Sequence, residues 1–421
     1  MSESKKWDWD TSEELIATPS EWKTKFARVQ EPYVSPDGKK VAAIARNEDG
    51  TYTACVNGEA WENTYENMWN LRFGPDGRLT AIVSEAGEWT LAVDGVPWEN
   101  KFAYVWDTKF NEDGQTIAVK IQQDTRYGLA VNDQPWENLF EHIGKYVMTP
   151  DGQYMAAAVQ AVPLGQAEVF KFKDEGTWTV AVNGNAWEKI FTNVWGLDCS
   201  PDGKHVAAEV RMGLYDYTIA MDGEMWPEKF NCVWEPVFRP KTSEALATAP
   251  VRAAGKWTLA VNGKPVWDSK FVQCWHQTYS PDGRKLAAIV APSFGQWTVA
   301  IDGKLWATTF NELVTDLTFS PDGNRLAAIA KDDGHWKIVV DGTPWPAMYD
   351  MVWPPVFSPD GSKVASKVEK GGKYTIALNG KPWRECEALW NPVFSPDGKK
   401  VLVRCIEDGK YYRRIVPISE F

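Results

Sequence analysis

Short apolar runs separated by tight polar turns repeat along the whole chain. In one stretch the runs 69–73, 79–83 and 89–93 are divided by Gly74-Pro75-Asp76-Gly77 and by a polar connection, and the last run enters Asp94-Gly95. Proline presets the first turn position and glycine accepts positive φ, so the first divider is a turn. Asp-Gly suits a two-residue type I′ hairpin. With the strand that Trp98 opens, the pattern predicts four short strands per unit and no helices.

The turn sequence itself recurs ten times, as Ser-Pro-Asp-Gly or a near relative, about every 37 to 41 residues with one longer gap. Ser35-Pro36-Asp37-Gly38 and Ser320-Pro321-Asp322-Gly323 are two of the copies. A four-stranded sheet repeated about every 40 residues is typical of a β-propeller blade. The sequence therefore predicts an all-β protein, a β-propeller of four-stranded blades.

The phase of the repeat at both ends predicts how the ring closes. The segment Glu21–Phe26 resembles a last strand and precedes the first turn, whereas Tyr411–Val416 lacks a following partner. We expect this N-terminal strand to complete the final blade, which gives one ten-bladed ring. The alternative is two five-bladed rings with a seam at the degenerate turn Pro240–Ser243. Residues 1–20 are expected to be an extension and 21–421 the propeller.

Tryptophan follows the same repeat, since 22 of the 24 residues fall into three classes. One class opens the strand after the hairpin, a second lies about eight residues later, and the third starts the strand before the hairpin. Large rings fill space efficiently between twisted blades, so we expect packing to explain most of them, with stacking platforms for a ligand as the alternative. The three classes are Trp22, Trp61, Trp98, Trp136, Trp187, Trp226, Trp267, Trp306, Trp345 and Trp383; Trp69, Trp106, Trp195, Trp234, Trp275, Trp353 and Trp390; and Trp89, Trp178, Trp257, Trp297 and Trp336.

Charge and composition narrow the class of partner and the compartment. The net charge is −12, which disfavours a nucleic-acid partner. The N-terminus lacks the apolar core of a secretory signal. The sequence contains no run of 18 apolar residues, so no direct membrane span is expected. Six scattered cysteines without Cys-x-x-Cys spacing predict free thiols in a reducing compartment and no metal, haem or other cofactor. We therefore expect a cytoplasmic protein.

No catalytic motif is found. The four histidines occupy non-equivalent repeat positions, and neither a Gly-x-Ser-x-Gly nor a His-Glu-x-x-His sequence is present. The turn aspartates lack the closely spaced oxygen ligands that calcium needs, so they are interpreted as turn formers. The expectation is a protein that is not an enzyme.

Two departures from the repeat are candidate docking elements. The fourth unit carries a long connection at about 160–177, expected to be a projecting hairpin, whose apolar residues could contact another protein. A hairpin folded back on its own ring is the other interpretation. The N-terminal extension adds two aromatics that could anchor on the ring or on a partner. The docking candidates are Val162, Leu164, Val169, Phe170, Phe172, Trp7 and Trp9.

The residues Ser35 to Ile44, Ser-Pro-Asp-Gly-Lys-Lys-Val-Ala-Ala-Ile, resemble the propeller repeat of the TolB type, a relative of WD-repeat propellers. The resemblance extends over nearly the whole chain. The chain lacks the signal sequence and separate N-terminal domain of secreted TolB, and the hydrolase domain of propeller-bearing prolyl peptidases.

Its size, leaderless N-terminus and tryptophan content are also similar to the tryptophan-rich subunit of the Tmc transmembrane redox complex of sulfate-reducing bacteria. That resemblance implies a subunit without a cofactor, whose partners are iron–sulfur and cytochrome subunits, at the inner face of the cytoplasmic membrane. Two functions are therefore expected: a non-catalytic interaction subunit of an electron-transfer complex, or a propeller, a degenerate hydrolase, that binds a small ligand or carbohydrate through aromatics and carboxylates.

Overall fold

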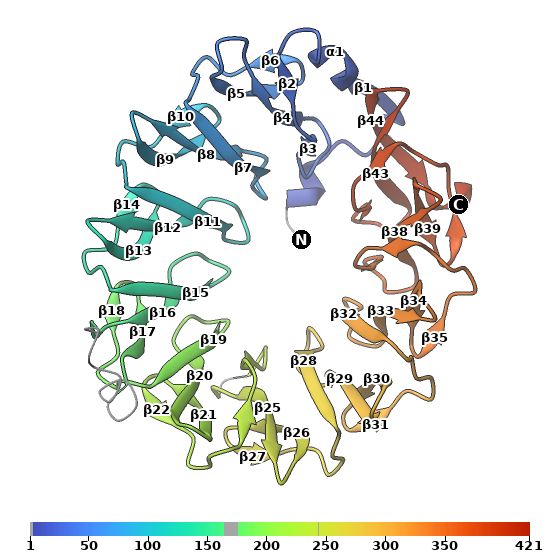
Figure 1. The fold of residues 1–421 in the computed structure, drawn as a ribbon. Helices are drawn as coiled ribbons and strands as arrows, with labels where there is room; N and C mark the ends of the chain where they lie inside the picture. Colours follow the sequence, from blue (N-terminus) through green and yellow to red (C-terminus); the bar gives the residue numbers. More distant parts are fainter. Residues whose placement is uncertain (1–2, 164–175, 243) are drawn as a thin grey trace. The chain divides into compact units, whose positions relative to one another are not determined.

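The computed structural model describes residues 3–163, 176–242 and 244–421, and these fold into ten antiparallel sheets in sequence order (Figure 1). The protein is an all-β, ten-bladed propeller, which confirms the predicted fold class and blade number. The blades belong to two compact units. Unit 1 comprises Met1–Asp124, Ala130–Pro135 and Trp345–Phe421, and unit 2 comprises Thr125–Leu129 and Trp136–Pro344.

Blades 1 to 3 follow the N-terminal segment, which contains the 3-10 helix η1 (Glu3–Lys6), β1 (Glu13–Ala17) and α1 (Pro19–Trp22). Their strands are β2 (Arg28–Val29), β3 (Tyr33–Val34), β4 (Val41–Arg46), β5 (Tyr52–Val56) and β6 (Glu59–Ala60); β7 (Asn67–Phe73), β8 (Leu79–Glu85), β9 (Glu88–Val93) and β10 (Val96–Pro97); and β11 (Tyr104–Phe110), β12 (Ile117–Gln123), β13 (Arg126–Val131) and β14 (Gln134–Pro135).

Blades 4 to 8 follow in unit 2. Their strands are β15 (His142–Met148), β16 (Met155–Gln160), β17 (Trp178–Val182) and β18 (Asn185–Ala186); β19 (Asn193–Cys199), β20 (Val206–Gly213), β21 (Asp216–Met221) and β22 (Glu224–Met225); β23 (Cys232–Val233), β24 (Val237–Phe238), β25 (Ala247–Ala253), β26 (Lys256–Val261) and β27 (Lys264–Pro265); β28 (Gln273–Tyr279), β29 (Leu286–Ser293), β30 (Gln296–Ile301) and β31 (Lys304–Leu305); and β32 (Leu313–Phe319), β33 (Leu326–Asp332), β34 (His335–Val340) and β35 (Thr343–Pro344).

Blades 9 and 10 return to unit 1. Their strands are β36 (Met351–Val352), β37 (Val356–Phe357), β38 (Val364–Lys370), β39 (Lys373–Leu378) and β40 (Lys381–Pro382); and β41 (Ala388–Leu389), β42 (Val393–Phe394), β43 (Lys400–Glu407) and β44 (Lys410–Pro417), before the 3-10 helix η2 (Ile418–Glu420).

The first strand of each blade is interrupted at one repeat position. In six blades its register with the second strand shifts there, as between Trp69 and Arg72 of β7. In the other four the strand is split in two at proline, as at Pro236 between β23 and β24. Proline has no N–H for the ladder, and an extra residue re-aims the side chains beside it. The residue at the interruption is therefore not held by the backbone hydrogen bonds between the first and second strands.

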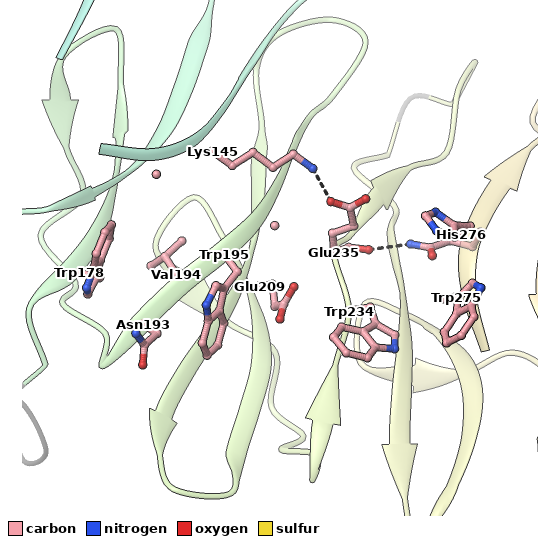
Figure 2. Close-up of a pocket in the computed structure, with 13 residues that line it drawn as sticks. Lys145, Trp178, Asn193, Val194, Trp195, Glu209, Trp234, Glu235, Trp275 and His276 are labelled. Atoms are coloured by element: carbon pink, nitrogen blue, oxygen red, sulfur yellow. Dashed lines mark hydrogen bonds and ion pairs between the residues drawn. The ribbon is translucent and has the colours of Figure 1, made fainter. Parts of the chain in front are cut away.

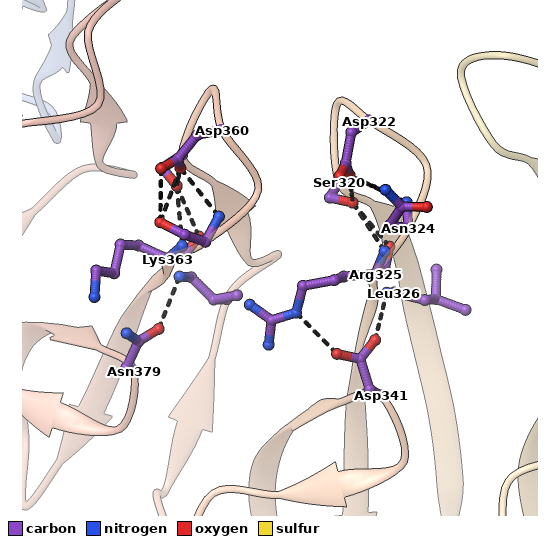
Figure 3. Close-up of polar contacts among 12 residues, drawn as sticks. Ser320, Asp322, Asn324, Arg325, Leu326, Asp341, Asp360, Lys363 and Asn379 are labelled. Carbon is purple, nitrogen blue, oxygen red and sulfur yellow. Dashed lines mark hydrogen bonds and ion pairs between the residues drawn. The ribbon is translucent and has the colours of Figure 1, made fainter.

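Side-chain hydrogen bonds hold the recurring turn, as Figure 3 shows. Ser320 Oγ donates to Asp322 Oδ1 over 2.5 Å and accepts from the Arg325 N–H at 2.9 Å, while Asp322 Oδ1 accepts from the Asn324 N–H at 3.1 Å. Asp341 of the following hairpin accepts from the Leu326 N–H at 2.8 Å. The aspartates act as turn formers, as predicted, because their oxygens satisfy backbone donors.

Tryptophans of the first class pack on the hairpin glycine of the next blade. Asp341 and Gly342 have φ of 51° and 78°, the type I′ conformation that Asp-Gly predicts. A Cβ at Gly342 would lie 3.1 Å from the Trp306 ring, and one at Gly303 would lie 3.5 Å from the Trp267 ring. Glycine at these positions therefore leaves space for the indole, and the contact couples these hairpins to the preceding blades.

An N-terminal strand completes blade 10, but it is not the predicted one. Strand β1 pairs antiparallel with β44, with Glu13 opposite Arg414. The prediction of Glu21–Phe26 is wrong, because Pro19 begins the helix α1, where its missing N–H costs nothing. Trp22 is nevertheless only 2% exposed, in one apolar cluster with Tyr411.

Candidate binding pocket

The predicted docking residues are only partly within the described chain. Leu164, Val169, Phe170 and Phe172 lie outside it, as does most of the predicted hairpin. Val162 is half-buried, and its N–H donates to the Thr177 carbonyl at 3.3 Å.

Trp7 and Trp9 are half-buried and stack on each other, with ring centroids 6.2 Å apart. Trp9 Nε1 donates to the Ser4 carbonyl at 2.8 Å. Trp7 also lines a hollow of unit 1 that includes Trp390 and Arg404. These two aromatics therefore have contacts within unit 1.

A repeat position that the sequence analysis overlooked carries unusual charge. The fourth residue of the second strand's apolar run is apolar in six blades, namely Ile44, Ile82, Ala158, Pro250, Ile289 and Ile329. The other four blades have Lys120, Glu209, Lys367 and Arg404 there. Alignment of the repeats by their turns would have revealed these four departures.

The three cations at this position have contacts of their own. Lys120 Nζ lies 2.9 Å from a carboxylate oxygen of Asp107, and Lys367 Nζ lies 3.9 Å from the centroid of the Trp353 ring. Arg404 donates to main-chain carbonyls, among them Asn391 at 2.6 Å. Glu209 is the single acid of the set, and only 8% of its surface is exposed.

Glu209 lies in a pocket of about 660 Å³ within unit 2 (Figure 2). Tryptophans dominate the lining, and three of them, Trp195, Trp234 and Trp275, hold the same repeat position in blades 5, 6 and 7. The full lining is Gly144, Lys145, Trp178, Asn193, Val194, Trp195, Gly196, Glu209, Trp234, Glu235, Trp275, His276 and Gln277.

Two glycines leave room for this pocket. Gly144 holds the repeat position at which the neighbouring blades have tryptophan. A Cβ added at Gly144 would lie 3.7 Å from the Trp178 ring. A Cβ at Gly196 would overlap the Cβ of Glu235. Glycine permits such close backbone approach. A larger residue at either position would therefore fill or deform the pocket.

Each of the three repeat-phased tryptophans stacks on an aromatic of its own blade. The ring centroids are 6.0 Å apart for Trp195 and Tyr217, 5.4 Å for Trp234 and Trp257, and 4.7 Å for Trp275 and Trp297. Trp195 and Trp234 remain 41% and 39% exposed. Packing thus explains one side of these rings, as predicted, but it leaves substantial indole surface exposed beside Glu209.

Burial disfavours the charged form of Glu209 in the pocket and of Asp198 on β19. It raises the pKa of Glu209 to about 7, against the donation of the Gly196 N–H, which lowers it. Burial likewise raises the pKa of Asp198 to about 6, although the N–H groups of Phe238 and Cys199 donate to its carboxylate.

The ammonium group that lines the pocket, that of Lys145, is paired with a carboxylate other than Glu209. Lys145 forms an ion pair with Glu235, the residue at the strand interruption of blade 6. Gln277 fixes the Glu235 backbone by donating to its carbonyl at 2.7 Å. Glu209 therefore has a main-chain donor in Gly196, while the ammonium group is held by the neighbouring carboxylate (Figure 2).

The structure also brings together two cysteines that the sequence separates. The Sγ atoms of Cys386 and Cys405 and an oxygen of Glu407 lie within 4.8 Å of one another. Arg414 Nη1 lies 2.9 Å from Cys405 Sγ and 2.7 Å from Glu407. A hydrogen bond to Cys405, with burial, raises the pKa of Cys386 well above its usual range. The described thiols are free, as predicted.

No helix in the described residues is long and apolar enough to cross a membrane. No protein-family model matches this sequence. No curated protein matches it either.

Solved structures similar to the chain include a crystal structure titled as the eukaryotic initiation factor, at 11% identity, covering 79% of this chain and 90% of that one, with a TM-score of 0.48. The Cps50 (Swd1) β-propeller domain of Myceliophteria thermophila is 12% identical, with 65% and 95% covered and a TM-score of 0.32. The Dos1 propeller is 12% identical, with 87% and 94% covered and a TM-score of 0.37. Likeness at these values carries no argument about function. Two of the titles name propellers.

Proposed function

We propose that this protein is a non-catalytic protein-interaction module that binds its partner through the tryptophan pocket of unit 2. The observation that carries the proposal is the exposed indole surface of Trp195 and Trp234 around a buried acid. Tryptophan is enriched among the few residues that dominate binding energy at protein interfaces.

We further propose that the partner belongs to an electron-transfer complex. The resemblance to the tryptophan-rich subunit of the Tmc complex supports a scaffold in a membrane-associated electron-transfer complex linked to sulfate respiration. The partners would then be iron–sulfur and cytochrome subunits at the inner face of the cytoplasmic membrane, and the protein itself would carry no cofactor.

The test is native affinity purification from the source organism with identification of the co-purifying proteins. Wild type is compared with the double variant Trp195→Ala/Trp234→Ala and with Trp106→Ala, which changes the same repeat position in blade 3. We expect membrane cytochrome and iron–sulfur subunits with wild type and Trp106→Ala, and their loss with the double variant. Equal recovery with all three would place the contact away from the pocket, and recovery of the protein alone would reject the interaction role.

A second candidate function is binding of a carbohydrate or another small ligand. Indole faces beside carboxylates are suited to sugar rings, and the pocket volume lies in the range of small-molecule sites. Titration with neutral oligosaccharides, followed by tryptophan fluorescence, separates the two. Saturable binding that Trp195→Ala/Trp234→Ala abolishes would favour the carbohydrate function.

A further inference from the structure

We infer that the pocket around Glu209 takes an alkylammonium group, the side chain of a lysine presented by a partner polypeptide. This inference rests on the proposed interaction function and specifies its ligand.

Charge is the first argument. Glu209 is 8% exposed and aims its carboxylate into the pocket between Trp195 and Trp234 (Figure 2). The nearby ammonium of Lys145 pairs with Glu235 instead. Buried carboxylates are costly unless a cation or several donors compensate them. An incoming ammonium would supply that compensation.

The tryptophans supply the second argument. Ring faces attract ammonium and guanidinium groups within about 6 Å, most strongly where water is excluded. Arg211 already lies 5.7 Å from the centroid of the Trp195 ring. The walls of the pocket therefore favour a cation over an anion of the same size.

Blade 9 contains an internal example of the proposed contact. Lys367 holds the same repeat position as Glu209, and Trp353 the same position as Trp195. The Lys367 ammonium lies 3.9 Å from the Trp353 centroid and 4.7 Å from that of Tyr374. This repeat can thus hold an ammonium beside the same tryptophan and third-strand aromatic. Blade 5 keeps the aromatic pair, Trp195 and Tyr217, but replaces the internal lysine with an acid.

Protonation of Glu209 would weaken this binding. The titratable groups that act on it or line its pocket are Lys145, Cys232, Glu235 and His276. Because its pKa is raised to about 7, Glu209 is largely protonated at pH 6 and largely ionised at pH 8. Affinity for a cation should therefore rise across this interval, whereas affinity for a neutral ligand should not.

The experiment is calorimetric titration of the full chain with two capped pentapeptides that differ only in a central lysine or norleucine. Free butylammonium is a third probe and distinguishes a presented side chain from a free amine. We expect the lysine peptide to bind about tenfold more tightly than the norleucine peptide at pH 8, with most of that preference lost at pH 6. Glu209→Gln should remove the preference at pH 8, whereas Glu188→Gln, an exposed glutamate outside the lining, should retain it.

The pH series on wild type tests the inference independently of the Glu209→Gln variant. Equal binding of the two peptides, a preference that does not change with pH, or no binding of the lysine peptide would overturn it. Tighter binding of butylammonium than of the peptide would also overturn it, in favour of a small amine. If partners co-purify through the pocket tryptophans but the lysine preference is absent, the ligand assignment fails while the interaction function stands.

Discussion

At the scale of single residues, Glu209 occupies a place where stability alone would favour an apolar side chain. Six blades have an apolar residue at this position, and burial raises the pKa of this one acid to about 7. Perturbed carboxylates cluster at functional sites, where stability is given up for binding. Glu209 should therefore destabilise the unliganded protein.

Glu209→Gln is expected to stabilise the protein at pH 8 by about 2 kcal/mol, because it removes a buried charge while keeping the side-chain shape. The raised pKa means that the folded state binds the proton more tightly than the unfolded state. The stabilisation by this proton is complete below about pH 4.5 and is lost as the pH rises through about 7. Denaturant unfolding should therefore show the gain at pH 8 and none at pH 4.5. The same gain at both values would contradict the buried charge as its cause.

The aspartates of the recurring turn have the opposite pH dependence. Hydrogen bonds from Ser320 and the Asn324 N–H lower the pKa of Asp322 to about 2, from 3.8. Its stabilisation is therefore present above about pH 4 and is lost as the pH falls towards 2. We expect Asp322→Asn to lower the melting temperature at pH 7, with the difference shrinking as the pH falls from about 4 through 2. Asp124→Asn, in an exposed turn, is the control and should have little effect at either pH.

The sequence predicts the turn aspartates well because their contacts are local, within five residues. The pocket is different. Its residues come from several blades, and its space depends on the absence of a side chain at Gly144 and on the close approach of Glu235 to Gly196. The break in the tryptophan class at Gly144 and the acid at position 209 were readable signals, but their meeting in one pocket required the structure.

At the scale of strands and hairpins, the contact between hairpin glycine and indole links one blade to the next. Blade 3 is an exception, because its hairpin has no glycine at this position. The hairpin of blade 3 has Asp133 in place of glycine, and the Asp133 carboxylate accepts from the N–H groups of Glu99 and Asn100 at 2.8 and 3.1 Å. At the glycine position of this hairpin, an aspartate side chain thus accepts hydrogen bonds from the two N–H groups that follow Trp98.

Blade 8 offers a matched pair of glycines to measure this contact. Gly334 and Gly342 both have φ of 78° after an aspartate, but a Cβ at Gly334 would meet open space whereas one at Gly342 would approach the Trp306 ring. We expect alanine at either site to cost about 1 kcal/mol for the left-handed backbone, and Gly342→Ala about 1 kcal/mol more for crowding. Equal losses in chemical unfolding would show that the indole contact is not tightly packed.

The sequence predicts the strands less completely than the turns. Periodicity located the second and third strands of each unit, as at 79–83 and 89–93 within β8 and β9. It missed the interruption of the first strand, because a proline or a bulge there leaves the apolar pattern intact. It also misplaced the last strand, which was expected to open at Trp98, whereas β10 ends at Pro97.

At the scale of the whole molecule, the pairing of β1 with β44 joins the two ends of the chain in one blade. Arg414 of β44 is 6% exposed and contacts Glu13 at 2.6 Å and Glu407 at 2.7 Å. The repeat phase predicted a closing strand, but the strand itself was misplaced because α1 retains the tryptophan of the repeat in a helical turn.

Removal of residues 1–18 should expose the edge of β44 and leave Arg414 without its Glu13 contact. We expect the melting temperature to fall by about 5 °C or more, and concentration-dependent association to appear, because an unpaired edge strand is a template for another chain. Removal of residues 1–10, which retains β1, is the control and should not cause association. Scanning calorimetry and sedimentation velocity measure both effects. A monomeric 19–421 chain with unchanged melting would show that β1 is dispensable.

The pairing of β1 with β44 also determines when blade 10 can be completed during synthesis. Within this propeller, β1 is translated first and its partner β44 last. Until β44 has been synthesised, β1 therefore has no partner strand, however many intermediate blades have already formed. A product that stops before β44 therefore leaves β1 without its partner strand and blade 10 incomplete.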